Sequence, residues 1–238
     1  SCAERMIPVV LECGGKDPVI VAADADIKLA AEHSLWSAMA NAGQSCIGAE
    51  RVYVVQSVAD EFIEEITKQA KKLHAGKSYG PATMPSQLNV IQSHLTDAAN
   101  HGAKFAVGGA DSVHAPFVDP VIMLEVPENS TAMSEETFGP TLAINRVSSV
   151  EEAIELSNAS NYGLAAAVFS KRSGEKIASQ LQCGMVSINS VFLFAAVATV
   201  PFGGVKDSGY GRIHGAEGLL EYTYARTVVK PRFRLPIT

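Results

Sequence analysis

Short runs of β-branched and aliphatic residues alternate along this chain with longer segments in which apolar residues recur every three or four positions. Strands are predicted at residues 9–11, 19–21, 51–55, 104–107, 141–147, 164–170 and 185–188, and helices at 27–40, at 87–100 and from about Val150 and Gly174. This rhythm predicts an α/β fold with a mostly parallel, twisted sheet and helices on both faces.

Single residues refine this pattern at three places. Gly43 ends the first helix, so Cys46 is expected in the turn beyond it. Ser57 is expected to cap the helix that follows residues 51–55. Pro120 should bend the apolar run at 117–126 or confine it to a sheet edge.

The amino-acid composition of the chain changes after Asn189. A long loop rich in glycine and apolar residues covers 201–212, and loops of this length in compact domains are usually functional or disordered. Its apolar and aromatic content favours a functional loop. A short helix near Glu217 and a final strand at 226–229 are predicted to close the chain.

Composition limits the classes of function. The chain has 238 residues, 47% hydrophobic and 18% charged, which is typical of a folded globular protein. Its net charge of −6 argues against nucleic acid or an anionic membrane as the main partner. The apolar run at 191–200 is too short to span a bilayer. We expect a cytoplasmic, reducing setting.

The cysteines and histidines do not form a metal-binding pattern. No Cys-x-x-Cys pair occurs among the four cysteines, which argues against zinc and against a disulfide framework. The six histidines lack metal-ligand spacing and are expected at the surface or at helix ends. We therefore predict no metal site.

Two polar residues in glycine-rich segments suggest covalent chemistry. Cys46 lies in GQSCIG (43–48), and Glu12 leads ECGGK (12–16). A thiolate that attacks a carbonyl carbon and a carboxylate that takes a proton from water are the minimum set for acyl chemistry. Cys46 follows a helix, so a helix dipole does not lower its pKa, and backbone amides near Ile47 are expected to bind the developing oxyanion.

Four motifs occur together in one order: ECGGK (12–16), GQSC (43–46), ETFGP (136–140) and PFGG (201–204). With them, essentially the whole chain resembles the C-terminal, catalytic portion of aldehyde dehydrogenases. The resemblance implies that Cys46 attacks a small-molecule aldehyde to give a thiohemiacetal, which becomes a thioester as NAD or NADP is reduced. Glu12 would be the general base that hydrolyses the thioester.

The same resemblance assigns the coenzyme and substrate contacts. Glu136 would hold the nicotinamide ribose, with Phe138 beside it. Phe192, Phe194 and Phe202 would shape the aldehyde tunnel. No charged residue occurs between 189 and 205, which favours an uncharged or apolar aldehyde.

The resemblance also implies a domain division. Residues 1–16 would be a remnant of the coenzyme-binding domain, 17–213 the catalytic domain, and 214–238 a helix and strand for contacts in a homodimer or higher homo-oligomer. The isolated chain is then expected to show little dehydrogenase activity. Cys13 stands where the family usually has leucine and is expected to be a small buried hydrophobe. Ile213 stands where many members have a second glutamate, which puts that proton relay in doubt.

Alternatives stay open at this point. Cys46 could be a buried structural cysteine, and the three aromatic residues could be ordinary core. The chain could be a non-catalytic oligomerisation module that keeps the fold. Acyl-phosphate reductases also use a cysteine and a nicotinamide, but they have no need for a hydrolytic base at Glu12.

Overall fold

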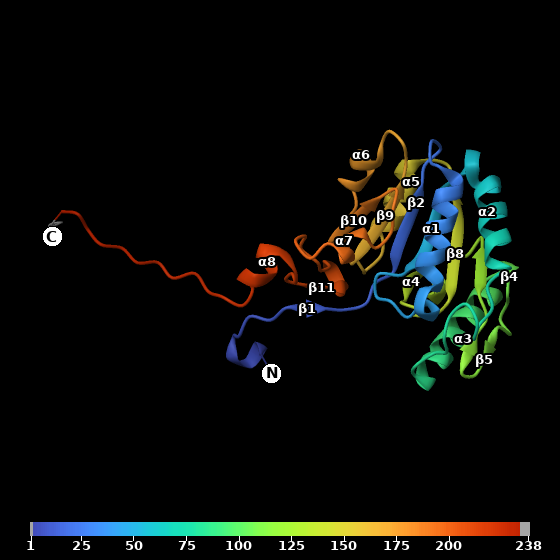
Figure 1. Cartoon of the computed structure of the whole chain (residues 1–238), viewed down its shortest axis with the longest axis horizontal. Coiled ribbons are helices and arrows are strands. Elements are labelled where there is room, and N and C mark those ends of the chain that lie inside the picture. The colour runs from blue at the N-terminus through green and yellow to red at the C-terminus, as the bar shows by residue number, and fades with distance from the viewer. Residues whose placement is uncertain (1, 234–238) are drawn as a thin grey trace.

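The computed structural model describes residues 2–233, which form a seven-stranded sheet flanked by helices and two short two-stranded ribbons (Figure 1). The strands are β1 (Leu11–Glu12), β2 (Asp17–Val21), β3 (Ala49–Val55), β4 (Lys104–Val107), β5 (Val113–His114), β6 (Phe117–Val118), β7 (Val121–Leu124), β8 (Thr141–Val147), β9 (Ala165–Phe169), β10 (Met185–Ile188) and β11 (Gly209–Tyr210). The α-helices are α1 (Ile27–Met39), α2 (Gln56–Ala70), α3 (Pro85–Asn100), α4 (Thr131–Ser134), α5 (Val150–Asn158), α6 (Gly174–Ala178), α7 (Leu193–Ala196) and α8 (Gly215–Leu220), and 3-10 turns are η1 (Ala3–Arg5), η2 (Ala40–Gly43) and η3 (Lys206–Ser208).

The order of strands in the main sheet is β10-β9-β2-β3-β8-β7-β4. All neighbours are parallel except the edge strand β4, which runs antiparallel to β7. The predicted α/β class with a mostly parallel sheet is therefore confirmed.

Helices cover both faces of the sheet because side chains of a strand alternate between its two sides. In β2, Val19 and Val21 join the core under α1 and α2, whereas Ile20 joins the core under α3, α4, α5 and α6. All three side chains are at most 1% exposed. Two-sided burial explains why β2 is a continuous apolar run rather than an alternating one.

The parallel direction of the central strands brings distant segments of the sequence together. Glu12, Cys46 and Glu136 lie in the segments that lead into β2, β3 and β8, and these three strands are neighbours in the sheet. Strands that run in the same direction begin at the same edge. The three residues therefore gather at the amino-terminal edge of the sheet.

The two ends of the described chain lie outside the main body. β1 pairs with β11, Leu11 opposite Tyr210, and this ribbon projects from the body together with α8 (Figure 1). The strand predicted at 226–229 is wrong: these residues are irregular, and Val228 and Val229 are 83% and 81% exposed. An apolar segment forms a strand only where another strand accepts its hydrogen bonds, and no strand among residues 2–233 does so.

Three further predictions concern element boundaries. The capping role of Ser57 is wrong, because α2 begins at Gln56 directly from β3 and no side chain caps it. Pro120 does interrupt its apolar run, which is divided into β6 and β7. The short helix near Glu217 is confirmed as α8. None of the helices in residues 2–233 has the length and apolarity that crossing a bilayer demands.

Candidate functional site

Cys46 occupies a tight turn between α1 and β3. The N–H of Gly48 donates to the carbonyl of Ser45 at 3.0 Å, so Cys46 and Ile47 are the central residues of the turn. Within the described residues, the backbone N–H groups of Cys46 and Ile47 donate to no acceptor. Two free donors therefore flank the thiol, as the sequence led us to expect for an oxyanion site.

The side chain of Glu12, at the end of β1, lies beside this thiol. Burial, the charge of Glu12 and a hydrogen bond between the two side chains together raise the pKa of Cys46 to about 11. Glu12 itself is exposed. The two residues that sequence reasoning named as nucleophile and base thus meet, and the thiol rests protonated next to an acceptor for its proton.

Glu136 lies against the same loop as Glu12. The N–H of Gly15 donates to Oε1 of Glu136 at 3.1 Å. A Cβ atom on Gly14 would lie 2.1 Å from Oε2 of Glu136, so only glycine leaves room for the carboxyl group here. Burial raises the pKa of Glu136 to about 7, partly offset by the bond from Gly15.

Contacts between glycines lock the Cys46 loop to the loop that carries Glu136. A Cβ on Gly43 would lie 2.0 Å from the carbonyl oxygen of Gly139, and the φ of Gly43 is +70°. On the other side, a Cβ on Gly15 would lie 2.7 Å from the carbonyl oxygen of Cys46. The glycines of the motifs therefore let three backbones approach each other closely.

The predicted tunnel residues divide between two places. Phe202, buried, and Phe194 join Cys46 and Ile47 in one apolar cluster, and their ring centroids are 6.4 Å apart. Phe192 instead packs edge-on against Trp36 of α1, with centroids 5.2 Å apart. Phe192 and Phe194 nevertheless line one small pocket with Ile47.

Phe138 follows Glu136 and has a φ of +50°, a left-handed conformation that is uncommon for an aromatic residue. It is half-buried. Its N–H donates to Oε1 of Glu50 at 2.9 Å, so the turn after Glu136 is held from β3.

Sequence reasoning missed a buried polar group behind the site. It consists of Lys16, Glu50, Thr137 and His94. The expectation that all histidines lie at the surface or at helix ends is wrong for His94, which is 3% exposed. A signal was present, because His94 falls on the apolar stripe of α3 between Ile91 and Leu95. The expectation that Cys13 is buried is also wrong: it is exposed and directly follows β1, which pairs only with β11.

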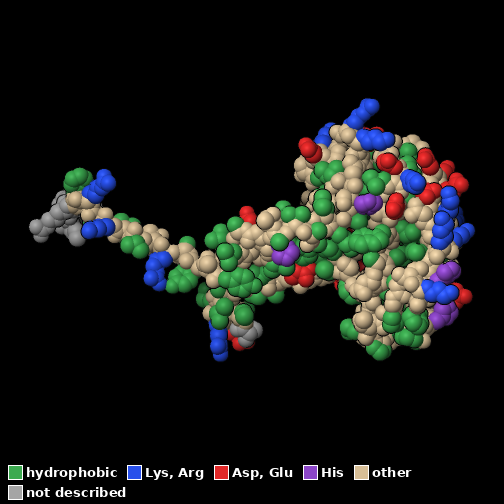
Figure 2. Space-filling view, viewed as in Figure 1, with side chains coloured by type: hydrophobic (Ala, Val, Ile, Leu, Met, Phe, Trp, Pro, Cys, Tyr) green, Lys and Arg blue, Asp and Glu red, His purple; other side chains and the backbone are tan. Residues whose placement is uncertain are grey.

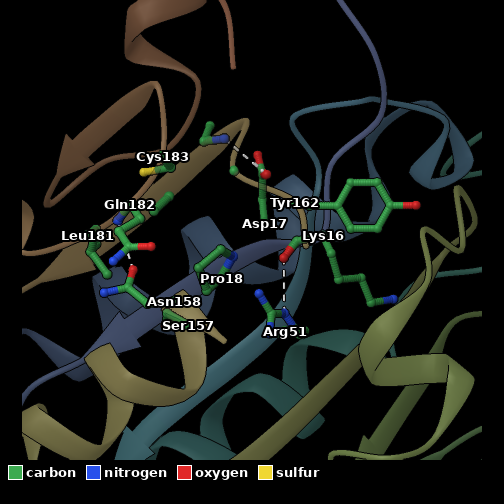
Figure 3. A pocket seen from close by; sticks show the side chains of 13 residues that line it. Lys16, Asp17, Pro18, Arg51, Ser157, Asn158, Tyr162, Leu181, Gln182 and Cys183 are labelled. Carbon is green, nitrogen blue, oxygen red and sulfur yellow. Dashed lines mark hydrogen bonds between the residues drawn. The ribbon is translucent and has the colours of Figure 1, made fainter. Parts of the chain in front are cut away.

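A second buried acid lies on the other side of Lys16. Oδ1 of Asp17 accepts the N–H of Ala165 at 3.0 Å, and the guanidinium of Arg51 donates to the carbonyl of Lys16 (Figure 3). Oδ2 of Asp17 has no hydrogen-bond partner among residues 2–233, and burial raises the pKa of this acid well above its usual range. These residues line a small, partly open pocket whose lining includes neither Cys46 nor Glu12.

Within residues 2–233, His, Cys, Asp and Glu side chains form no group of three or more that could hold a metal ion. The donor atoms that do converge are a thiol, two carboxylates and free backbone amides. This arrangement suits attack on a carbonyl carbon and recognition of hydroxyl groups.

Comparison with known proteins points in the same direction. The model of the aldehyde dehydrogenase family matches residues 1–228. The chain is 41% identical to the 4,4'-diapolycopene aldehyde oxidase of a Methylomonas species over 98% of this chain and 45% of that protein. It is 38% identical to a putative NADP(+) succinate-semialdehyde dehydrogenase of Mycolicibacterium smegmatis, over 98% of this chain and 47% of that one.

Solved structures agree with the fold. The betaine aldehyde dehydrogenase of Staphylococcus aureus in complex with NAD+ superimposes with a TM-score of 0.86 at 34% identity, covering 92% of this chain and 46% of that one. The chain thus spans about half the length of the relatives and structures it matches.

Proposed function

We propose, from the premise that this chain belongs to the aldehyde dehydrogenase family, that it carries the catalytic machinery for oxidising an aldehyde to a carboxylic acid with NAD or NADP. Cys46 is the nucleophile and Glu12 the general base. Glu136 and Phe138 hold the nicotinamide ribose. Phe194 and Phe202 line the approach to the thiol, and Phe192 lies further out beside Trp36.

The proposed sequence starts with proton transfer. Glu12 takes the proton of the Cys46 thiol, and Sγ then forms a bond to the aldehyde carbon while the carbonyl π electrons move to oxygen. The N–H groups of Cys46 and Ile47 donate to this oxyanion; such a donor is worth about a hundredfold to a thousandfold in rate. NAD or NADP, held by Glu136 with Phe138 beside it, would supply the acceptor for the hydride of this carbon.

Glu12 acts again in the second half of the reaction. The product of oxidation is a thioester on Cys46. Once Glu12 has released the thiol proton to solvent, its carboxylate removes a proton from water, which attacks the thioester carbon and releases the carboxylic acid. The Cys46 thiolate leaves and is reprotonated. Exposure of Glu12 gives this water a path to the site.

The residues present fit the nicotinamide ribose. The N–H of Gly15 donates to one Glu136 oxygen, and the half-buried carboxyl group keeps further lone pairs for the hydroxyl groups of a ribose. Phe138 supplies an adjacent half-buried aromatic surface. This fit supports a coenzyme role for the 136–140 segment.

The observation that carries the proposal is the contact between the Cys46 and Glu12 side chains. It is tested by hydrolysis of p-nitrophenyl acetate, which needs only a nucleophile and a base. Cys46→Ala should abolish hydrolysis and acetyl transfer to the protein, measured by mass spectrometry. Cys183→Ala is the matched control, because Cys183 is also half-buried. Unchanged hydrolysis in Cys46→Ala refutes the proposal.

Substrate class is a finer proposal. No charged residue occurs between 189 and 205, and the pocket beside Ile47 is lined mostly by apolar residues, among them Val191, Phe192 and Phe194, together with the buried acid Asp17. We infer an uncharged or apolar aldehyde. Turnover of hexanal should exceed that of succinic semialdehyde in the holoenzyme, and the reverse preference would contradict the inference.

We propose that copies of this chain assemble through the apolar surface of the part that projects from the main body. Leu219 and Leu220 on α8 and Tyr210 on β11 are 72%, 64% and 55% exposed. Hydrophobic side chains gather on the narrow part that projects from the main body (Figure 2). Exposed apolar surface of this extent favours a homodimer or higher homo-oligomer. This surface alone also suits a non-catalytic oligomerisation module. Iodoacetamide separates the two: alkylation of Cys46 that accelerates as the pH approaches the raised pKa of its thiol favours the enzyme, and a folded thiol that stays inert over this range favours the module.

A further inference from the structure

A buried ion pair lies behind the three loops of the proposed site. Nζ of Lys16 pairs with Oε2 of Glu50, and the two side chains are 1% and 7% exposed. Lys16 also donates to Oγ1 of Thr137 at 3.1 Å. Each residue belongs to a different motif segment: Lys16 ends ECGGK, Glu50 follows the Cys46 turn in β3, and Thr137 follows Glu136.

Glu50 holds the backbone immediately after Glu136. Its carboxylate accepts the N–H of Thr137 at 2.9 Å on Oε2 and the N–H of Phe138 at 2.9 Å on Oε1. These donors are adjacent in a turn where Phe138 adopts a φ of +50°. A non-glycine residue keeps this conformation only where its surroundings impose it, and the carboxylate of Glu50 supplies that constraint.

Thr137 and His94 complete the network. Nδ1 of His94 lies 3.1 Å from Oγ1 of Thr137, and Nε2 lies 3.5 Å from Oε2 of Glu135. Burial lowers the pKa of His94, which favours its neutral form. A neutral ring with its proton on Nε2 accepts the hydroxyl proton of Thr137, whose oxygen accepts from Lys16. Each of these contacts then joins one donor to one acceptor.

We propose that Lys16, Glu50 and Thr137 are positioning residues, which fix the Glu136 segment against the loops of Glu12 and Cys46 so that its carboxyl group faces Gly15. In one respect this rests on the proposed function: Glu136 is taken as the ligand of the coenzyme ribose. The positioning itself is a property of the loops and holds or fails independently of turnover.

A contribution to folding stability does not explain why this buried polar network is present. Removing two charges from water costs several kcal/mol per ion, and buried pairs are often no more stabilising than apolar residues of similar volume. What an apolar pair cannot do is accept two consecutive amide groups at fixed positions. The carboxylate of Glu50 does this with its two oxygens while Lys16 balances its charge.

Amide hydrogen exchange, followed by NMR on the complete chain, measures the positioning directly. In Glu50→Gln one carbonyl oxygen replaces the carboxylate, so the amides of Thr137 and Phe138 should exchange roughly 10- to 100-fold faster. The amide of Gly15 should also exchange faster, because Glu136 moves away from it. Glu125→Gln is the matched control, since it breaks an exposed pair with Lys104.

A charge-compensated variant separates positioning from stability. Lys16→Met/Glu50→Gln leaves no unpaired buried charge, so its urea midpoint should approach that of the wild type. The exchange at Thr137, Phe138 and Gly15 should stay about tenfold or more above wild type. Wild-type protection of these amides in the double variant overturns the proposal, as does equal acceleration of all buried amides.

Thr137 provides a milder pair of variants in case the charge variants fold poorly. Thr137→Val removes the hydroxyl group that links Lys16 to His94, and Thr137→Ser restores it. The exchange rate of the Gly15 amide should rise severalfold in the valine variant and fall back to the wild-type rate in the serine variant. Equal behaviour of the two variants contradicts the proposal.

Ester hydrolysis distinguishes failure of this proposal from failure of the proposed function. It uses Cys46 and Glu12 but not Glu136, so the variants should keep it within about threefold of wild type while the loop loses protection. Unchanged exchange at Thr137, Phe138 and Gly15 refutes the positioning role, even if Cys46 proves catalytic.

Discussion

Replacing Glu12 with glutamine should make Cys46 more reactive towards an alkylating reagent and less effective in catalysis. Burial, the charge of Glu12 and its hydrogen bond raise the pKa of the thiol from 9.0 to about 11. At about pH 8, such a pKa leaves roughly one thiol in a thousand ionised. Glu12 is exposed, so water and salt screen its charge, and we expect Glu12→Gln to accelerate alkylation only about three- to tenfold.

The assay is the rate of iodoacetamide labelling at Cys46 as a function of pH, with Glu61→Gln on the exposed face of α2 as control. The midpoint of the profile should move to lower pH in Glu12→Gln alone. Hydrolysis of p-nitrophenyl acetate should fall about a hundredfold or more, because the base is lost. A midpoint that does not move, or moves upwards, would show that the carboxylate does not act on the thiol.

Two other substitutions test the packing behind the site. Gly43→Ala should lower the free energy of unfolding by about 2–4 kcal/mol in a urea titration, because its Cβ would meet the carbonyl oxygen of Gly139 at 2.0 Å and its φ is +70°. A change below about 0.5 kcal/mol would contradict the contact. Asp17→Asn should gain stability relative to wild type, by about 1–3 kcal/mol, as pH rises from about 4 to 7. Burial raises the pKa of Asp17 in the folded chain well above its usual value of 3.8. Above pH 3.8 the acid therefore ionises more readily in the unfolded chain, and the wild type loses stability as the pH rises. Asparagine does not ionise and escapes this loss. If the free energies of unfolding of the wild type and of Asp17→Asn change in parallel with pH, this reasoning is refuted.

The fold was largely accessible from the sequence because it depends on local patterns. The runs at 141–147 and 185–188 coincide with β8 and β10, because short, mostly apolar runs between turn residues are typical of strands. Errors arose where an element depends on a partner. Residues 226–229 have a strand-like composition but nothing among the described residues to pair with.

The site was accessible only in part. The glycines of the motifs indicated close backbone contacts, and Cys46 and Glu12 do lie together. No periodicity could show that Glu50 accepts two amides of a segment far along the chain. Nothing in the sequence pattern distinguishes Glu50 from a surface charge, because a sequence does not state which acids pair with a buried lysine.

The gathering of three loops at the amino-terminal edge of the sheet has a consequence for folding. The segments that contain residues 12, 46 and 136 become neighbours only after β2, β3 and β8 have paired side by side. Contacts of such long sequence separation carry a large loop-closure cost and form late. A partly folded chain should therefore expose its cysteine without the carboxylates beside it, and catalytic competence should appear only with the last, cooperative step towards the native state.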